Sequence, residues 1–132
     1  MTLLQDRKGK AMAKILIVDD EVLITNSLVG NLKMLGYDIC GAKNSKEAFE
    51  ALENFRPNIL LIDINLREKV SGFDILKKGL ELNPNTKVAV LTGGDYPIQD
   101  CLKHGIKTVI KKPIAFEKLI ETINDLIKSL DS

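Results

Sequence analysis

The sequence ILIVDDE, residues 15–21, places four apolar residues directly before three acidic ones. An apolar run of this length is typical of a strand that is buried on both faces of a parallel sheet. An acid after such a strand can cap the next helix, because carboxylates favour the positive end of the helix dipole. Capping accounts for one or two acids. It does not require the adjacent pair Asp19 and Asp20, so this pair needs another explanation.

Four more apolar runs follow this one along the chain. The five predicted strands are KILIVD (14–19), YDICGA (37–42), NILLID (58–63), TKVAVLT (86–92) and KTVIKK (107–112). A segment with helical periodicity follows each strand. Strict alternation of strand and helix predicts right-handed βαβ units. The expected fold is therefore α/β, with a doubly wound, five-stranded parallel sheet and helices on both faces.

The predicted helices cover about 22–35, 44–55, 73–82, 96–103 and 115–130. The second starts with Asn44 and has Glu47 three residues later, which is the spacing of a capping box. The fourth has the weakest apolar pattern, so it is the helix we expect to pack least firmly. Residues 14–130 form the predicted domain, and the polar residues 1–13 form a predicted flexible tail.

Composition restricts the class of protein. A chain of 132 residues with 45% hydrophobic residues and a mean hydropathy of +0.02 fits one globular domain. The net charge of +1 provides no bulk field that would favour nucleic acid or an anionic membrane. No apolar run approaches the length of a membrane span or a signal peptide. We expect a cytoplasmic protein with Cys40 and Cys101 reduced.

Polar residues lie where four of the predicted strands end. Asp19 and Asp20 follow the first strand, Asp63 ends the third, Thr92 ends the fourth and Lys112 ends the fifth. Each of these could be a helix cap or a solvated side chain. In an open parallel sheet, however, ligands bind outside the carboxyl ends of the strands. Convergence of all these groups at one edge therefore predicts a site.

The residue types of this site indicate its chemistry. Two carboxylates 4 Å apart repel by about 4 kcal/mol at an effective dielectric of 20, so protonation or a cation must relieve the cluster. Oxygen ligands without His or Cys favour a hard divalent ion, and the expected ion is Mg²⁺. Lys112 and Thr92 would then contact phosphoryl oxygens. A carboxylate nucleophile such as Asp63 would form an aspartyl phosphate.

The motifs VDDE, LLIDINL, SGFDIL, VLTGG and IKKP occur in this order. With them the chain resembles, over about residues 14–130, the receiver domain of two-component response regulators. The resemblance implies a flavodoxin-like fold with strand order 2-1-3-4-5. It also implies transfer of a phosphoryl group from a phosphohistidine to Asp63. Such a domain is a signalling phosphoacceptor with its own autophosphorylation and autodephosphorylation chemistry, rather than an enzyme.

The resemblance further implies a ligand set for Mg²⁺. Asp20 and Asp63 would bind the ion directly, the backbone carbonyl of Asn65 would be the third protein ligand, and Asp19 would act through water. Thr92 and Lys112 would meet the phosphoryl group and switch partner binding. The peptide bond between Lys112 and its following proline would be cis.

The implied partners are a sensor histidine kinase or a histidine phosphotransferase, and a downstream effector. The effector would read the face made by the fourth helix, the fifth strand and the fifth helix. Candidate apolar contacts there, which could equally be core residues, are Ile98, Ile106 and Ile114. No direct contact with nucleic acid or membrane is expected, and the protein would be a monomer or a phosphorylation-dependent dimer.

The chain departs from the family pattern at three places. The loop INLREKVSG (64–72) is one residue longer than usual and carries Arg67 where a proline is common. Val109 replaces a frequent aromatic residue of the fifth strand, so an aromatic swing cannot be the switch. Gly94, two residues after Thr92, is often larger or acidic in relatives, which leaves the lifetime of the phosphate open.

Three other functions compete with this interpretation. A flavin or nucleotide site would need a phosphate-binding loop after the first strand, where acids stand instead. A Mg²⁺-dependent phosphatase with an aspartyl nucleophile needs a second acid where Asn65 stands, and a cap over the site. A degenerate receiver that acts only as an interaction module would not need the intact acidic set.

Overall fold

The computed structural model describes residues 13–93, 98–103 and 105–130. Five parallel strands form one sheet in the order β2-β1-β3-β4-β5. Their bounds are Lys14–Val18 for β1, Asp38–Ala42 for β2, Ile59–Asp63 for β3, Lys87–Thr92 for β4 and Thr108–Lys111 for β5. The order and the parallel pairing confirm the predicted α/β fold.

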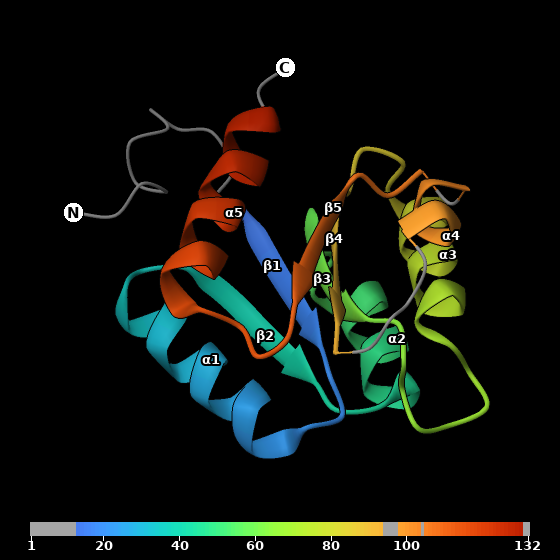
Figure 1. Cartoon of the computed structure of the whole chain (residues 1–132), viewed down its shortest axis with the longest axis horizontal. Coiled ribbons are helices and arrows are strands. Elements are labelled where there is room, and N and C mark those ends of the chain that lie inside the picture. Colours follow the sequence, from blue (N-terminus) through green and yellow to red (C-terminus); the bar gives the residue numbers. More distant parts are fainter. Residues whose placement is uncertain (1–12, 94–97, 104, 131–132) are drawn as a thin grey trace.

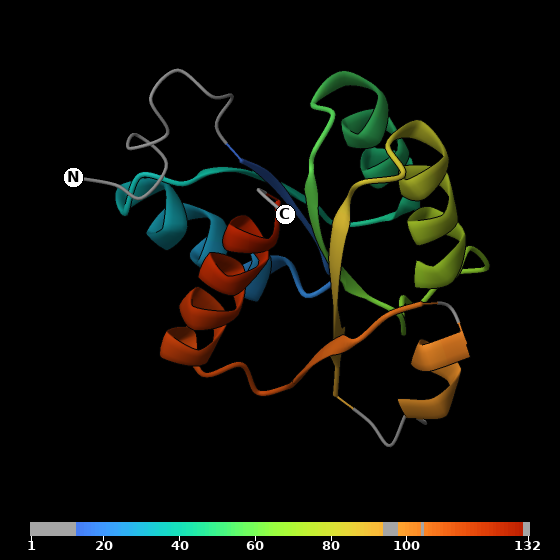
Figure 2. The ribbon, with the colours of Figure 1, turned by 90° about the horizontal axis from the view of Figure 1, so that it is seen from above.

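Helices cover both faces of this sheet. Their bounds are Val22–Met34 for α1, Ser45–Asn54 for α2, Gly72–Leu82 for α3, Ile98–Lys103 for α4 and Phe116–Ser129 for α5. Helices α1 and α5 lie on one face, and α2, α3 and α4 lie on the other (Figures 1 and 2). The two groups arise because the chain leaves β1 toward one edge and returns through β3 to the other.

The apolar run that opens the sequence supplies both halves of the core. Side chains alternate along a strand, so successive residues of β1 point to opposite faces. Ile15 and Ile17 join the cluster under α1 and α5. Leu16 and Val18 join the cluster under α2, α3 and α4. All four are fully buried, which explains why the run is continuous rather than alternating.

The helix starts correct two details of the prediction. Asn44 caps α2 by accepting from the backbone N–H of Glu47, but the Glu47 carboxylate accepts from Lys43 N rather than from Asn44 N. The reciprocal capping box is instead at α3, where Ser71 and Asp74 cap each other's backbone N–H groups. The predicted start of this helix at residue 73 is therefore one residue too late.

The structure also locates the end of the predicted tail and two of the candidate effector contacts. Ala13, assigned to the tail, is 5% exposed and belongs to the core, whereas residues 1–12 lie outside the described residues. Ile106 is a core residue at 3% exposure, so it is not an effector contact. Ile114 packs partly against the core under α5. Gly94 and the side chain of Ile98 also lie outside the described residues.

Candidate functional site

The register of the sheet brings the acids together. Val18 of β1 is the neighbour of Ile62 of β3, so the next residues, Asp19 and Asp63, leave the two strands at the same level. On the other side of β3, Asp63 is paired with Leu91 of β4. Three carboxylates, from Asp19, Asp63 and the adjacent Asp20, each offer an oxygen within 4.8 Å of the others. The predicted convergence at the carboxyl edge is thus present.

Lys112 joins the acids from the end of β5. Its Nζ lies 2.6 Å from Asp19 Oδ2, 2.9 Å from Asp63 Oδ2 and 2.8 Å from Glu21 Oε1. The side chains of Asp19 and Asp63 are 1% and 7% exposed, and that of Lys112 is 13% exposed. One ammonium therefore neutralises part of a buried acidic cluster.

The two carboxylate oxygens of Asp19 have different surroundings. Its Oδ1 accepts from the backbone N–H of Glu21 at 3.0 Å, and its backbone carbonyl accepts from the hydroxyl of Thr25 at 3.0 Å. Among the residues that the structure describes, none donates a well-aligned hydrogen bond to the buried Oδ2. The short contact of this oxygen with Lys112 is an ion pair without hydrogen-bond geometry. Asp19 Oδ2 is consequently a buried acceptor whose nearest cation is Lys112.

Asp20 lies at the outer rim of the cluster and pairs with a different cation. Its Oδ2 accepts from Arg67 Nε at 3.0 Å and from the backbone N–H of Arg67 at 3.2 Å. The Asp20 side chain is 20% exposed and that of Arg67 is 78% exposed. The charge cluster thus has a buried part around Lys112 and a solvated part around Arg67.

The loop after β3 is shaped around Asp63. The Asp63 Oδ1 accepts from the backbone N–H of Asn65 at 2.8 Å. Further along, Gly72 begins α3 against the same residue: a Cβ at position 72 would lie 2.6 Å from the carbonyl oxygen of Asp63 and 2.6 Å from Ile64 Cα. Only glycine permits so close an approach. The glycine of SGFDIL therefore holds the start of α3 against the base of the site.

The charges alter the ionisation of three groups. Burial raises the pKa of Asp19 above its usual value, and this effect prevails over the opposing contact with Lys112. Burial also acts to raise the pKa of Asp20, but the hydrogen bonds and charge of Arg67 outweigh it, so the pKa is lowered. For Lys112, burial is outweighed by contacts with Asp19, Glu21 and Asp63, so its pKa is raised.

Thr92 lies at the end of β4, beside the cluster, and its backbone contacts Lys112. It is 4% exposed and stands one residue beyond the pair of Asp63 with Leu91. Its carbonyl accepts from the backbone N–H of Lys112 at 2.8 Å, which fixes the end of β5 against β4. The Lys112–Pro113 peptide is cis, as expected.

Two contacts of the site were not anticipated from the sequence. In the sequence, Arg67 stands out only as the replacement of a common proline and Glu21 only as a third acid, yet both are ion-pair partners in the cluster. Their contacts come from loops, which carry no periodic signal. The one feature of the sequence that could have predicted these ion pairs is the excess of acids after the first strand, because several clustered carboxylates need more than one cation.

The site opens to solvent as a pocket of about 280 Å³. Its lining consists of Asp20, Glu21, Asp63, Asn65, Arg67, Gly93 and Lys112. Clustered carboxylate oxygens without His or Cys match the ligands of a hard divalent cation. The lining also presents an ammonium and a guanidinium, so an anion can enter beside the carboxylates.

Comparison with known proteins identifies this arrangement. The model of the response regulator receiver domain matches residues 15–124, which is most of the chain. The chain belongs to the receiver domain family of response regulators. As a receiver domain, it is part of two-component signal transduction. The finding agrees with the family that its motifs resemble.

This receiver domain has relatives of different lengths. It is 30% identical to the chemotaxis protein CheY of Thermotoga maritima, over 87% of this chain and 98% of that protein. It is 29% identical to the uncharacterized transcriptional regulatory protein YesN of Bacillus subtilis, over 90% of this chain but only 33% of that protein. The chain thus corresponds to the whole of one relative and to about a third of another.

Solved structures show the same fold. A CheY-like response regulator receiver domain protein from Methanospirillum hungatei superimposes with a TM-score of 0.82 at 29% identity, covering 92% of this chain and 98% of that one. Chemotaxis protein CheY4 of Vibrio cholerae gives a TM-score of 0.78 at 27% identity, covering 88% and 99%. Within the described part of this receiver domain, no helix is long and apolar enough to cross a membrane.

Proposed function

We propose that this receiver domain accepts a phosphoryl group on Asp63 from a phosphohistidine of a sensor histidine kinase or a histidine phosphotransferase. The observation that carries the proposal is the place of Asp63. Its carboxylate ends the central strand, 2.9 Å from the ammonium of Lys112 and beside the carboxylates of Asp19 and Asp20. A nucleophile, a cation for the incoming phosphoryl group and a cluster suited to a metal therefore meet in one pocket.

The proposed metal is Mg²⁺, and the residues present fit it. Asp20, Asp63 and the carbonyl of Asn65 would hold the ion directly, and Asp19 would hold it through water. The buried Oδ2 of Asp19, to which no described residue donates a well-aligned hydrogen bond, supports this role. When bound, Mg²⁺ supplies positive charge that offsets the carboxylates and the oxygens of the arriving phosphoryl group.

In the transfer, a carboxylate oxygen of Asp63 forms a bond to phosphorus while the bond from phosphorus to the histidine nitrogen breaks. The departing imidazole keeps the electron pair of that bond and takes up a proton. The ammonium of Lys112, which contacts the Asp63 carboxylate before the transfer, then contacts the phosphoryl oxygens. Thr92, whose carbonyl holds Lys112 N, turns its hydroxyl to the phosphoryl group and transmits the change toward α4.

The output that we propose is altered binding of an effector to the face made by α4, β5 and α5. Helix α4 is the shortest helix of the described chain, with six residues. Val109 of β5 is partly buried against the core beneath it, and it is too small to need reorienting. The change therefore centres on the segment after Thr92 rather than on β5.

The test is incubation with acetyl phosphate and Mg²⁺, followed by mass measurement of the intact protein. We expect one phosphoryl group on the wild type and none on Asp63→Asn. Asp125→Asn, the same change at an exposed acid of α5, should leave phosphorylation intact. A stable phosphoryl group elsewhere would contradict the assignment, and sustained phosphate release from a small phosphoester would identify the phosphatase instead.

A further inference from the structure

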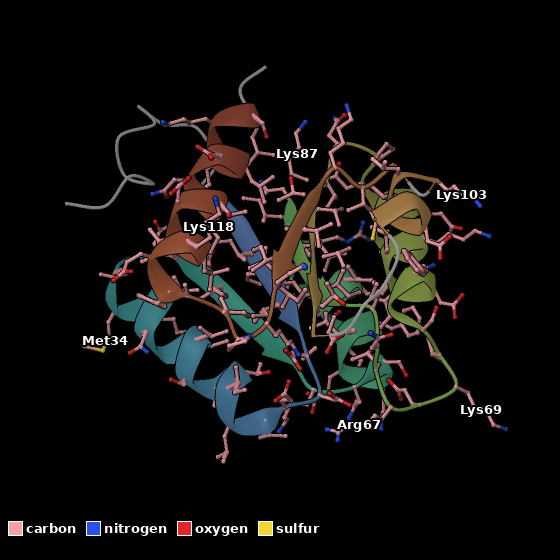
Figure 3. The ribbon with its side chains drawn as sticks, viewed as in Figure 1. Met34, Arg67, Lys69, Lys87, Lys103 and Lys118 are labelled. Atoms are coloured by element: carbon pink, nitrogen blue, oxygen red, sulfur yellow. The ribbon has the colours of Figure 1, made fainter. Side chains whose placement is uncertain are left out.

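Arg67 places a guanidinium directly on one of the proposed metal ligands. It lies four residues after Asp63, and Figure 3 shows its side chain at the edge of the sheet where the acids gather. Two donors of this one residue, Nε at 3.0 Å and the backbone N–H at 3.2 Å, converge on Oδ2 of Asp20. A single carboxylate oxygen is thus held by both the side chain and the backbone of Arg67.

The next residue fixes the loop on its other side. Glu68 accepts from the backbone N–H of Ser45 at 2.6 Å and from the Ser45 hydroxyl at 3.1 Å. Ser45 is the first residue of α2, so Glu68 fills the position that an anion prefers at a helix start. The loop after β3 is therefore tied to α2 by Glu68, and this tie delivers Arg67 to Asp20.

We propose that Arg67 is an internal cation that competes with Mg²⁺ for Asp20 and sets the Mg²⁺ concentration at which the site fills. This inference rests on the proposed function, because it assumes that Asp20 is a metal ligand. Both donors of Arg67 lie on Asp20 Oδ2, so a metal ion that takes this oxygen must displace the guanidinium, and one that takes Oδ1 must bind beside the guanidinium charge. With 78% of its side chain exposed, Arg67 can turn into water without disturbing the core.

The other cation of the site cannot play this part. Lys112 is 13% exposed and contacts three acids, so its withdrawal would leave the buried carboxylates of Asp19 and Asp63 without their cation. Arg67 contacts one partly exposed acid and remains near the pocket after it withdraws. Its charge then still opposes the entry of a divalent ion, most strongly at low ionic strength.

Isothermal titration calorimetry with Mg²⁺ tests the proposal on the full chain. Arg67→Gln should bind Mg²⁺ about fivefold more tightly than the wild type at low ionic strength, and the difference should narrow as salt is added. Lys69→Gln is the matched control, because Lys69 is exposed in the same loop and points away from Arg67 (Figure 3). It should change the affinity less than about 1.5-fold.

A second measurement follows Arg67 itself. The NMR resonance of its Nε–H should move as Mg²⁺ saturates the wild type, whereas that of Arg56, which donates to the Glu53 carbonyl, should not. Wild-type binding with equal affinities for Arg67→Gln and Lys69→Gln, or a static Arg67 resonance, would overturn this inference alone. Failure of every variant to bind Mg²⁺ would overturn the metal site, and this inference with it.

Discussion

The acidic cluster has two parts that are neutralised in different ways. We call Asp19, Asp63 and Lys112 the inner corner, where each side chain is 13% exposed or less. We call Asp20 and Arg67 the outer rim, where the two side chains are 20% and 78% exposed. Charges in the corner interact through a poorly solvated medium, whereas water and salt screen those at the rim.

This difference assigns different tasks to the two parts. Removing one partner of a buried ion pair leaves an uncompensated charge in the protein, so the corner is bound up with the stability of the fold. An exposed pair contributes little to stability and can be exchanged for another ion. The corner should therefore govern folding and phosphate chemistry, and the rim should adjust metal affinity without a large effect on folding.

The largest effect is expected in the corner, from Lys112→Met. Loss of the ammonium leaves Asp19 and Asp63 buried without their cation, which should lower the free energy of unfolding by about 3 kcal/mol at pH 7. Lys111→Met removes the same charge from an exposed position of β5 and should change the free energy of unfolding by less than about 0.5 kcal/mol. Urea unfolding without metal measures both.

The same variant should show a characteristic pH dependence. The pKa of Asp19 is already raised by burial, so the folded state binds its proton more tightly and stability falls as pH rises above the ordinary value near 3.8. Without Lys112 this pKa rises further, and the loss extends to higher pH. The deficit of Lys112→Met should therefore shrink on acidification. A deficit that is independent of pH would mean that lost packing, not charge, is its cause.

The next effect belongs to the rim, in Asp20→Asn. We expect Mg²⁺ affinity to fall more than tenfold, which corresponds to over about 1.4 kcal/mol, because a direct carboxylate ligand is lost. The thermal midpoint without metal should hardly change, since Asp20 is not part of the corner. Calorimetric titration and thermal melting provide the two numbers. A large drop in the midpoint with unchanged affinity would reverse the roles of corner and rim.

The smallest effect is expected from Glu21→Gln, which tests where the corner ends. Glu21 contacts Lys112 at 2.8 Å, yet its side chain is 43% exposed. Its removal should lower the free energy of unfolding by less than about 0.5 kcal/mol in the same urea experiment. If Glu21→Gln lost nearly as much free energy of unfolding as Lys112→Met, then proximity to Lys112, rather than burial, would decide which acids contribute to stability.

The sequence predicts the sheet and the corner for the same reason. A parallel sheet buries both faces of its central strands, so β1 and β3 are continuous apolar runs that end in polar residues. Because all the strands end at one edge, Asp19, Asp63 and Lys112 can be placed together without knowing any loop. The strand order comes from the family resemblance, and the structure agrees with it.

The rim is not predictable in this way. The contact of Arg67 with Asp20 depends on the path of a loop, which has no periodicity and is one residue longer than the usual spacing. The ties that shape it, such as Glu68 to Ser45, join residues far apart in sequence. The start of α3, by contrast, can be predicted from the sequence, since the S-x-x-D spacing of Ser71 and Asp74 is a capping signal.

The position of Lys112 along the chain affects the order in which the protein is made. Lys112 follows Asp63 by 49 residues and comes directly after the last strand of the sheet. A ribosome adding about 5–20 residues per second needs roughly 3–10 s to span that interval. During this time the nascent chain carries both carboxylates of the inner corner without their ammonium. The emerging polypeptide can complete the charge balance of the corner only after Lys112 has been synthesised, so the corner cannot close before that point.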